Sequence, residues 1–151
     1  MFFVKIVKNS MFLGLPPVYK WGSEAMKQRV VPPVLKGEKV ICLCVTEPTA
    51  GSDAASIKAE GRVFKDDDGE IKVKLNFAKR YITLAPIADL FSLFARTDGE
   101  RGGKGVTAFL IERGTEGLLT SGSTPVLQWL ESPIILTVSV QSLWRTRSIA
   151  R

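Results

Sequence analysis

The sequence predicts a mainly β fold, an antiparallel β-barrel or a pair of packed sheets, with a short helical segment at the N-terminal end. Between residues 40 and 111 the chain consists of short apolar segments separated by turn-forming residues, which is typical of a closed or sandwiched antiparallel sheet. Residues 71–75 alternate strictly between apolar and Lys side chains, the period of a strand with one buried face. Residues 22–31 precede this region and carry the start signal of a helix.

The helical segment starts at an N-cap residue. Ser23 can accept a hydrogen bond from the first turn, and Glu24 places a negative charge where the helix dipole favours it. The two prolines at positions 32 and 33 either end the helix or begin one further turn, which Gly37 can then close. The apolar opening of the chain contains two lysines and no arginine, so we interpret it as a buried or irregular helix start rather than a targeting signal.

Strand character begins at residue 40. Residues 39–46 form a continuous apolar run that is too short for a typical helix, and we expect a strand buried on both faces. The stretch Asp66-Asp67-Asp68-Gly69 predicts a turn, with Gly69 available for a positive φ. This turn separates a strand over residues 61–65 from the alternating strand. The remaining strands are expected at residues 79–83, 90–95 and 106–112.

Length and composition limit the classes of protein that remain. The 151 residues suit one domain, and 45% hydrophobic with 24% charged residues is typical of a globular chain. The absence of His excludes a catalytic imidazole and every His-ligated metal site. No apolar run approaches the ~18 residues that a membrane span needs, so we expect no membrane span.

The net charge of +6 lies at the ends of the chain. Residues 1–20 and 135–151 carry basic side chains without any acidic ones, whereas residues 21–134 contain equal numbers of basic and acidic side chains. A nucleic-acid-binding barrel needs a positive surface on its folded part. The neutral middle of the chain therefore argues against nucleic acid as a partner.

The two cysteines, Cys42 and Cys44, lie inside the first apolar run. Side chains two residues apart on a strand point to the same face, and a C-x-C pair without further Cys or His lacks the four ligands of a zinc site. We expect free thiols that pack as small hydrophobic groups, no metal site, and an intracellular, reducing compartment. The sequence does not distinguish between mitochondrial, peroxisomal and cytoplasmic locations.

The most informative segment is residues 46–53, Thr-Glu-Pro-Thr-Ala-Gly-Ser-Asp, which leaves the buried strand and enters a turn. Such a turn can direct several backbone N–H groups and a hydroxyl at one point, and Gly allows close approach. These are the donors that an anionic diphosphate requires. On residue types alone, an ordinary strand-ending Asx turn explains the same segment, and both interpretations are open.

Several motifs, in the same order along the chain, resemble those of the acyl-CoA dehydrogenase family. Residues 43–53, LCVTEPTAGSD, are similar to the family's T-E-P-x-A-G-S-D signature, and residues 76–83 are similar to its N-G-x-K-x-W-I-T strand. Further similarities follow at residues 88–98, 105–112 and 117–133, and residues 22–38 resemble the helical lead-in. The resemblance covers roughly residues 14–134.

The resemblance implies the middle β-barrel domain of the family, which supports the flavin of FAD. It divides the chain into residues 1–37, the end of an N-terminal helical domain, residues 38–134, the middle domain, and residues 135–151, a divergent basic tail. Because the resemblance is lost abruptly at the tail, it implies a fragment or a truncated member of the family.

The resemblance also implies which residues bind the cofactor. Thr46 would donate to the flavin ring, and Ser52 would reach a phosphate or the acyl-CoA substrate. Tyr81 would cover one face of the ring, and Thr83 would bond to its polar edge. The implied cofactor-binding residues are Leu43, Cys44, Val45, Thr46, Glu47, Gly51, Ser52, Tyr81, Ile82 and Thr83.

The sequence departs from the family pattern in three places. Phe77 stands where the family has Gly in a hairpin, which predicts a reshaped hairpin because a bulky residue at positive φ costs about 1–2 kcal/mol. Leu84-Ala85-Pro86 makes the following loop more apolar and stiffer than the family's. Tyr81 replaces the commoner Trp and can still stack on a ring.

No residue of the chain matches the family's catalytic base, which belongs to a C-terminal helical bundle. The resemblance thus implies the FAD-binding part of an oxidoreductase that acts on CH–CH groups of acyl-CoA thioesters in fatty acid metabolism, inactive by itself. An acyl-CoA substrate and a homo-oligomer are the partners expected of the completed protein. The alternative is a non-enzymatic remnant or interaction module that keeps the barrel but binds no flavin.

Overall fold

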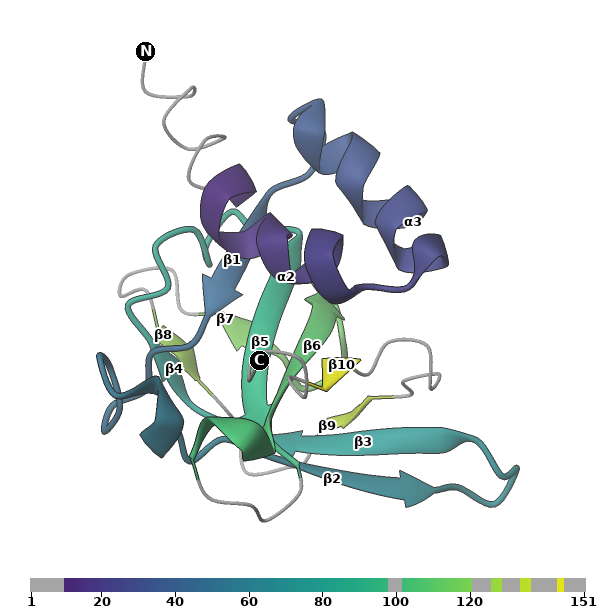
Figure 1. The fold of residues 1–151 in the computed structure, drawn as a ribbon, viewed down its shortest axis with the longest axis vertical. Coiled ribbons are helices and arrows are strands. Elements are labelled where there is room, and N and C mark those ends of the chain that lie inside the picture. Colours follow the sequence, from purple (N-terminus) through teal and green to yellow (C-terminus); the bar gives the residue numbers. More distant parts are fainter. Residues whose placement is uncertain (1–9, 98–101, 121–125, 129–133, 137–143, 146–151) are drawn as a thin grey trace.

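The computed structural model describes residues 10–97, 102–120, 126–128, 134–136 and 144–145. In these ranges most of the regular structure is strand, and short helices lie at the N-terminal end (Figure 1). The helical elements are the π-helix η1 (Ser10–Gly14), α2 (Leu15–Trp21), α3 (Glu24–Leu35) and two 3₁₀-helices, η2 (Ala54–Ser56) and η3 (Gly103–Gly105). The strands are β1 (Ile41–Cys44), β2 (Glu60–Lys65), β3 (Ile71–Asn76), β4 (Lys79–Arg80), β5 (Leu90–Arg96), β6 (Val106–Glu112), β7 (Leu119–Thr120), β8 (Val126–Gln128), β9 (Ile134–Leu136) and β10 (Trp144–Arg145).

Helix α3 begins at the predicted N-cap and continues through both prolines. The Ser23 Oγ accepts a hydrogen bond from the Met26 N–H at 3.2 Å. Of the two outcomes predicted at the prolines, the further turn is the one observed, and the helix ends at Leu35. Gly37 has a φ of 76°, which lets its N–H and that of Glu38 bond back to carbonyl groups of the last turn.

The strands form two sheets of unequal size. The larger has seven strands, in the order β10-β6-β5-β2-β3-β9, with β1 also paired to β5. β5 and β6 pair over their full length, and β2 and β3 form the long hairpin at the lower right of Figure 1. The turn of that hairpin contains Gly69 at a φ of 80°, as predicted. The smaller sheet has three strands, in the order β4-β8-β7.

The prediction of a closed antiparallel barrel is not confirmed. β1 runs parallel to β5, with Ile41 opposite Leu90 and Cys44 opposite Leu93, so the larger sheet is mixed. Within the described ranges its path ends at β9 and β10 without closing on itself. Short apolar segments indicate where strands lie but not their direction, and a continuous apolar run such as β1 is itself typical of a parallel strand.

The strand expected over residues 79–83 ends after two residues. β4 contains Lys79 and Arg80, and Tyr81 then adopts a φ of 57°, which interrupts the extended backbone. Phe77, at the position where a reshaped hairpin was expected, is buried in the core. β3 and β4 belong to different sheets, so the two strands do not form a hairpin with each other.

β5 lies at the centre of the fold and is buried on both faces. Phe91 and Leu93 pack into the main core, while Leu90 and Ser92 face the helices. The buried Ser92 hydroxyl donates to the Gly14 carbonyl at 2.7 Å, so it is satisfied. The helices therefore cover one face of the larger sheet and the main core fills the other. The core beneath the helices consists of Leu15, Val18, Met26, Val30, Val34, Ile41, Leu90 and Ala108.

The domain boundaries at residues 37 and 134 stay predictions. The irregular helix start falls partly on residues 1–9, and much of the tail on residues 137–143 and 146–151, which lie outside the described residues. The described parts of the tail pair with the larger sheet, β9 with β3 and β10 with β6. None of the helices in the described ranges combines the length and apolar composition that crossing a bilayer requires.

Candidate functional site

The motif over residues 46–53 and the segment over residues 81–83 are neighbours in the fold. The Arg80 N–H donates to the Thr46 carbonyl at 2.8 Å, which joins the backbone of β4 to the backbone of the motif. Leu43, just before the motif, and Thr83 line the same hollow. The fold thus brings together two segments that are far apart in the sequence.

A buried ion pair fixes this arrangement. The Lys79 Nζ lies 2.6 Å from Oε1 of Glu47, and the two side chains are 0% and 4% exposed. The same Nζ donates to the Val45 carbonyl at 3.0 Å. The Glu47 carboxylate also accepts the N–H groups of Lys58, at 2.6 Å, and Ala59, at 3.0 Å. Both ions are therefore paired and hydrogen-bonded, the condition under which charges are tolerated in a protein interior.

Burial dominates the electrostatics around this pair. It lowers the pKa of Lys79 below its ordinary value, although the Glu47 carboxylate acts in the opposite direction. Burial also raises the pKa of the Cys44 thiol well above its ordinary value, and the Cys42 thiol, 3.7 Å away, adds to this effect. A thiol with a raised pKa stays protonated at neutral pH, so Cys44 behaves as a small hydrophobic group.

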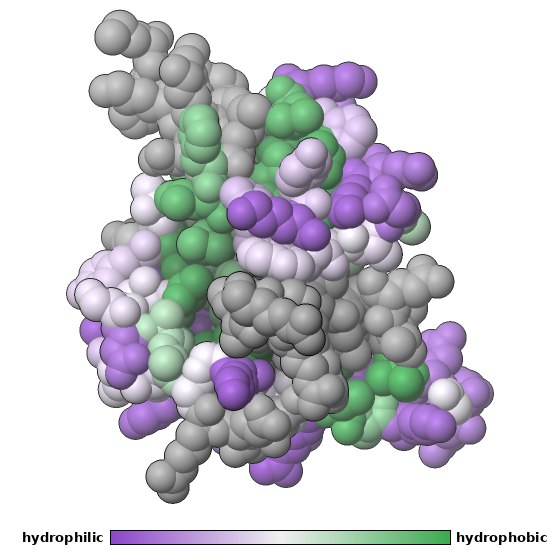
Figure 2. Space-filling view, in the orientation of Figure 1, coloured by the Kyte–Doolittle hydropathy of each residue, from purple (hydrophilic) through white to green (hydrophobic). Residues whose placement is uncertain are grey.

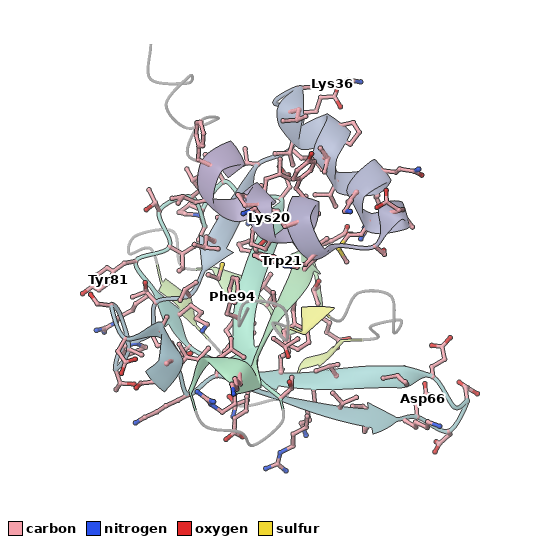
Figure 3. All side chains as sticks on the ribbon, viewed as in Figure 1. Lys20, Trp21, Lys36, Asp66, Tyr81 and Phe94 are labelled. Atoms are coloured by element: carbon pink, nitrogen blue, oxygen red, sulfur yellow. The ribbon has the colours of Figure 1, made fainter. Side chains whose placement is uncertain are left out.

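Tyr81 is strained and exposed. It is the one non-glycine residue of the described ranges with a positive φ, at 57°. Its side chain is 68% exposed, and Figure 3 shows it pointing away from the body of the fold. A bulky residue in the left-handed region costs about 1–2 kcal/mol, and an exposed ring gains little packing to offset that cost. Backbone strain of this kind at an exposed aromatic residue makes Tyr81 a candidate functional residue.

Replacing Tyr81 with Gly is expected to raise the free energy of unfolding by about 0.5–1 kcal/mol, because Gly adopts a positive φ without strain. Tyr19 is the matched control, since its side chain is 64% exposed but its backbone is helical. Tyr19→Gly should lower the free energy of unfolding by about 0.5–1 kcal/mol. Urea unfolding measures both changes, and a less stable Tyr81→Gly would show that the Tyr81 ring packs against the fold.

A hollow of about 100 Å³ opens beside Thr83 at the edge of β1. Figure 2 shows apolar surface, in green, over the part of the molecule where η1 and β1 lie in Figure 1. Apart from Thr83 the lining is apolar or weakly polar. The lining residues are Leu13, Cys42, Leu43, Thr83 and Leu84.

The motif itself forms two consecutive turns. The Glu47 N–H donates to the Ala50 carbonyl at 2.7 Å in the first, and the Ser56 hydroxyl donates to the Asp53 carboxylate in the second. The Asp53 carboxylate makes no capping hydrogen bond to a backbone N–H at the start of η2, so the Asx turn that one interpretation of the sequence predicted is not confirmed. Gly51 and Ser52 lie between the turns and are exposed, and a Cβ added at Gly51 would meet no atom within 4 Å. This open side lets a ligand approach the backbone.

The residues that the resemblance implied for the cofactor divide into two groups. Cys44 and Ile82 are buried in the main core, and Glu47 is buried in the ion pair. The others present at least part of their surface to solvent, at the end of β1, in the motif and after β4. They are Leu43, Val45, Thr46, Gly51, Ser52, Tyr81 and Thr83.

Two residues that the sequence did not mark as functional support the site. Lys79 holds the motif, and Arg113 donates to the carbonyl groups of Ala88, at 2.5 Å, and Ala85, at 2.6 Å, which anchors the turn after Thr83. The sequence carries no clear signal for Lys79, because in a strand over residues 79–83 it would share a face with Tyr81 and Thr83. It carries none for Arg113 either, because its partners here are backbone carbonyl groups.

Comparison with known proteins supports the resemblance to the acyl-CoA dehydrogenase family. The family model described as the acyl-CoA dehydrogenase middle domain matches residues 42–127. The short-chain-specific acyl-CoA dehydrogenase of Megasphaera elsdenii is 39% identical over 101 residues, which make up 67% of this chain and 25% of that protein. The structure of butyryl-CoA dehydrogenase from the same organism has a TM-score of 0.77 and 28% identity, covering 93% of this chain and 37% of that chain. An acyl-CoA dehydrogenase of Bacillus anthracis complexed with FAD has a TM-score of 0.73 and 28% identity, covering 91% of this chain and 24% of that chain.

The chain spans about a quarter of the length of the curated relatives it matches. The family match covers more than half of the chain and includes the motif, the ion pair and Tyr81. The likeness to solved structures extends over most of the described fold. Motifs, fold and sequence identity therefore agree, and the chain belongs to the acyl-CoA dehydrogenase family, with residues 42–127 corresponding to its middle domain.

Proposed function

We propose that this chain is the FAD-binding part of an oxidoreductase that acts on CH–CH groups of acyl-CoA thioesters. Family membership supports the class of enzyme, and the Bacillus anthracis relative is a complex with FAD. The chain spans about a quarter of the length of its relatives. Substrate, activity and partners are therefore proposed for the complete protein and not for this chain alone. The residues proposed to contact FAD are Leu43, Val45, Thr46, Gly51, Ser52, Tyr81 and Thr83.

The observation that carries the proposal is a strained, exposed Tyr81 two residues before Thr83, which lines an apolar hollow. A flavin is flat and amphipathic, so an aromatic face with a few fixed polar groups suits it. Thr46 and Thr83 offer hydroxyl groups from the two segments, and the exposed backbone at Gly51 and Ser52 is open to a diphosphate. The residues present therefore fit the cofactor. When bound, FAD supplies a two-electron acceptor for a hydride.

We also propose that the chain is inactive by itself. α,β-Dehydrogenation needs a base on the face of the acyl chain opposite the hydride acceptor. The Glu47 carboxylate lies in the motif but is held by Lys79 and two backbone N–H groups, so it is not available to take a substrate proton. For the complete protein we propose acyl-CoA as substrate, with Ser52 near it, and a homo-oligomeric assembly. The buried free thiols support a reducing compartment.

Titration of the purified chain with FAD, followed by flavin fluorescence and absorbance, tests the proposal. We expect weak binding by this chain, reduced about 2- to 10-fold further in Tyr81→Ala by the loss of a stacking contact of about 0.5–1.5 kcal/mol. Tyr81→Phe keeps the ring and should bind as the unchanged chain does. Tyr19→Ala, on the exposed face of α2, is the control for a general effect and should also bind normally.

The absence of bound flavin at a large excess of FAD would favour the alternative, an interaction module of the same fold. Incubation of the FAD-loaded chain with butyryl-CoA and palmitoyl-CoA and an artificial electron acceptor should give no turnover. Measurable dehydrogenation would contradict the proposal that the base lies outside this chain.

A further inference from the structure

The conformation of Tyr81 needs a structural cause. A residue in the left-handed region persists where the surrounding structure holds it there. The Tyr81 ring is exposed and does not supply the restraint itself. Its neighbours do, because Lys79 and Ile82, on either side of it, are both buried.

Lys79 attaches the chain before Tyr81 to the motif. Its ammonium group donates to the Glu47 carboxylate at 2.6 Å and to the Val45 carbonyl at 3.0 Å. One residue later the Arg80 N–H donates to the Thr46 carbonyl at 2.8 Å. These contacts restrict the backbone of β4 immediately before the strained residue.

Glu47 joins a third segment to the same point. Its carboxylate accepts the N–H groups of Lys58 and Ala59, which lie just before β2. With both oxygens bonded and the side chain 4% exposed, the carboxylate is not accessible to a ligand. Glu47 therefore connects the motif, the start of β2 and β4.

Arg113 anchors the other end of the Tyr81 segment. Its guanidinium group donates to the carbonyl groups of Ala85 and Ala88, in the turn that follows Thr83. The segment between β4 and this turn is therefore held at both ends. Of the two anchors, Lys79 also bonds to the motif itself.

We propose that Glu47 and Lys79 are positioning residues for the cofactor: neither touches it, and together they hold Tyr81 in its strained conformation beside the motif. The identity of the ligand rests on the proposed function above. The restraint on Tyr81 does not depend on the proposed function, because the contacts that impose it are present in the chain without a ligand. Glu47, which the resemblance implied as a cofactor contact, thus acts through Lys79.

The test uses the full 151-residue chain labelled with ¹⁵N, without FAD. A strong intraresidue amide–Hα cross-peak of Tyr81 reports the positive φ, and hydrogen exchange at the Arg80 amide reports the bond to Thr46. In Lys79→Met we expect the cross-peak to weaken and the Arg80 exchange to accelerate about tenfold or more, while the β5–β6 amides exchange as before. Lys27→Met, which removes the ammonium of the surface pair with Glu24, is the matched control and should change neither signal.

An unchanged Tyr81 cross-peak and unchanged Arg80 exchange in folded Lys79→Met would overturn the proposal. If that variant does not fold, Glu47→Gln/Lys79→Met, which leaves no unpaired charge, is judged by the same two signals. The unchanged chain offers a further test that needs no substitution. There the amides of Lys58, Ala59 and Arg80 should exchange hydrogen through one common opening of the structure. Hydrogen exchange at the Arg80 amide about tenfold faster than at the other two amides would also overturn the proposal.

Flavin titration separates this proposal from the proposed function. If the unchanged chain binds FAD, Lys79→Met should bind it about tenfold or more weakly, and Lys27→Met should bind it normally. Unaltered FAD affinity in a Lys79→Met chain whose Tyr81 has moved would refute the positioning role. If the unchanged chain does not bind FAD, the proposed function fails, and the NMR comparison still decides whether the pair holds Tyr81.

Discussion

Lys79→Met is expected to lower the free energy of unfolding by about 3–5 kcal/mol, because it leaves the Glu47 carboxylate buried without its cation. In the native fold the two groups are 2.6 Å apart and the carboxylate side chain is 4% exposed. Met keeps most of the aliphatic length of Lys, so the decrease in the free energy of unfolding comes more from the missing charge than from missing volume. Urea unfolding followed by circular dichroism measures it.

The double variant Glu47→Gln/Lys79→Met separates charge from packing. Burial lowers the pKa of Lys79 despite the attraction of Glu47, which indicates that desolvation of the ammonium is the larger effect. Removing both charges should therefore recover about 2 kcal/mol relative to Lys79→Met alone. Lys27→Met, at an exposed pair, should change the free energy of unfolding by less than about 0.5 kcal/mol. A double variant as unstable as Lys79→Met would contradict the electrostatic explanation.

Gly14→Ala is expected to lower the free energy of unfolding by about 1–3 kcal/mol, because a methyl group does not fit between η1 and β1. An added Cβ would lie 2.7 Å from the Ile41 carbonyl oxygen and 2.9 Å from its carbon. These are backbone atoms of a buried strand and cannot move aside as the end of a flexible side chain does. Because Leu13 lines the hollow, displacement of η1 should also weaken FAD binding.

Gly51→Ala is the matched control for this effect. A Cβ there would meet no atom within 4 Å, and the φ of Gly51 is not in the left-handed region. The free energy of unfolding should stay unchanged or rise by up to about 1 kcal/mol. Urea unfolding compares the two variants, and a Gly14→Ala chain as stable as Gly51→Ala would show that η1 does not approach β1 so closely.

Local sequence signals predicted structure well where one residue decides the backbone geometry. Ser23 caps α3, Gly37 closes it, and Gly69 turns the β2–β3 hairpin, each as expected from its own chemistry. The alternation in β3 likewise places Val73 and Leu75 in the core. These features depend on a few consecutive residues, so a sequence contains them in full.

Strand direction and the conformation after β4 were not predictable in this way. β1 and β5 are both buried on two faces, and that pattern is the same whether the strands run parallel or antiparallel. The residues at positions 79–83 have strand propensity, yet Tyr81 turns the chain because anchors elsewhere in the fold hold it. Propensity is a weak guide where tertiary contacts oppose it.

The sequence by itself determined the family, the positions of most strands and the two segments that form the site, because these follow from motifs and from the spacing of apolar residues. The tertiary structure alone decided which of those residues are exposed. It buried Ile82, left Tyr81 in solvent, and placed Glu47 in an ion pair with a lysine 32 residues away. Burial and ion pairing depend on contacts between distant parts of the chain, and such contacts exist only once the chain has folded.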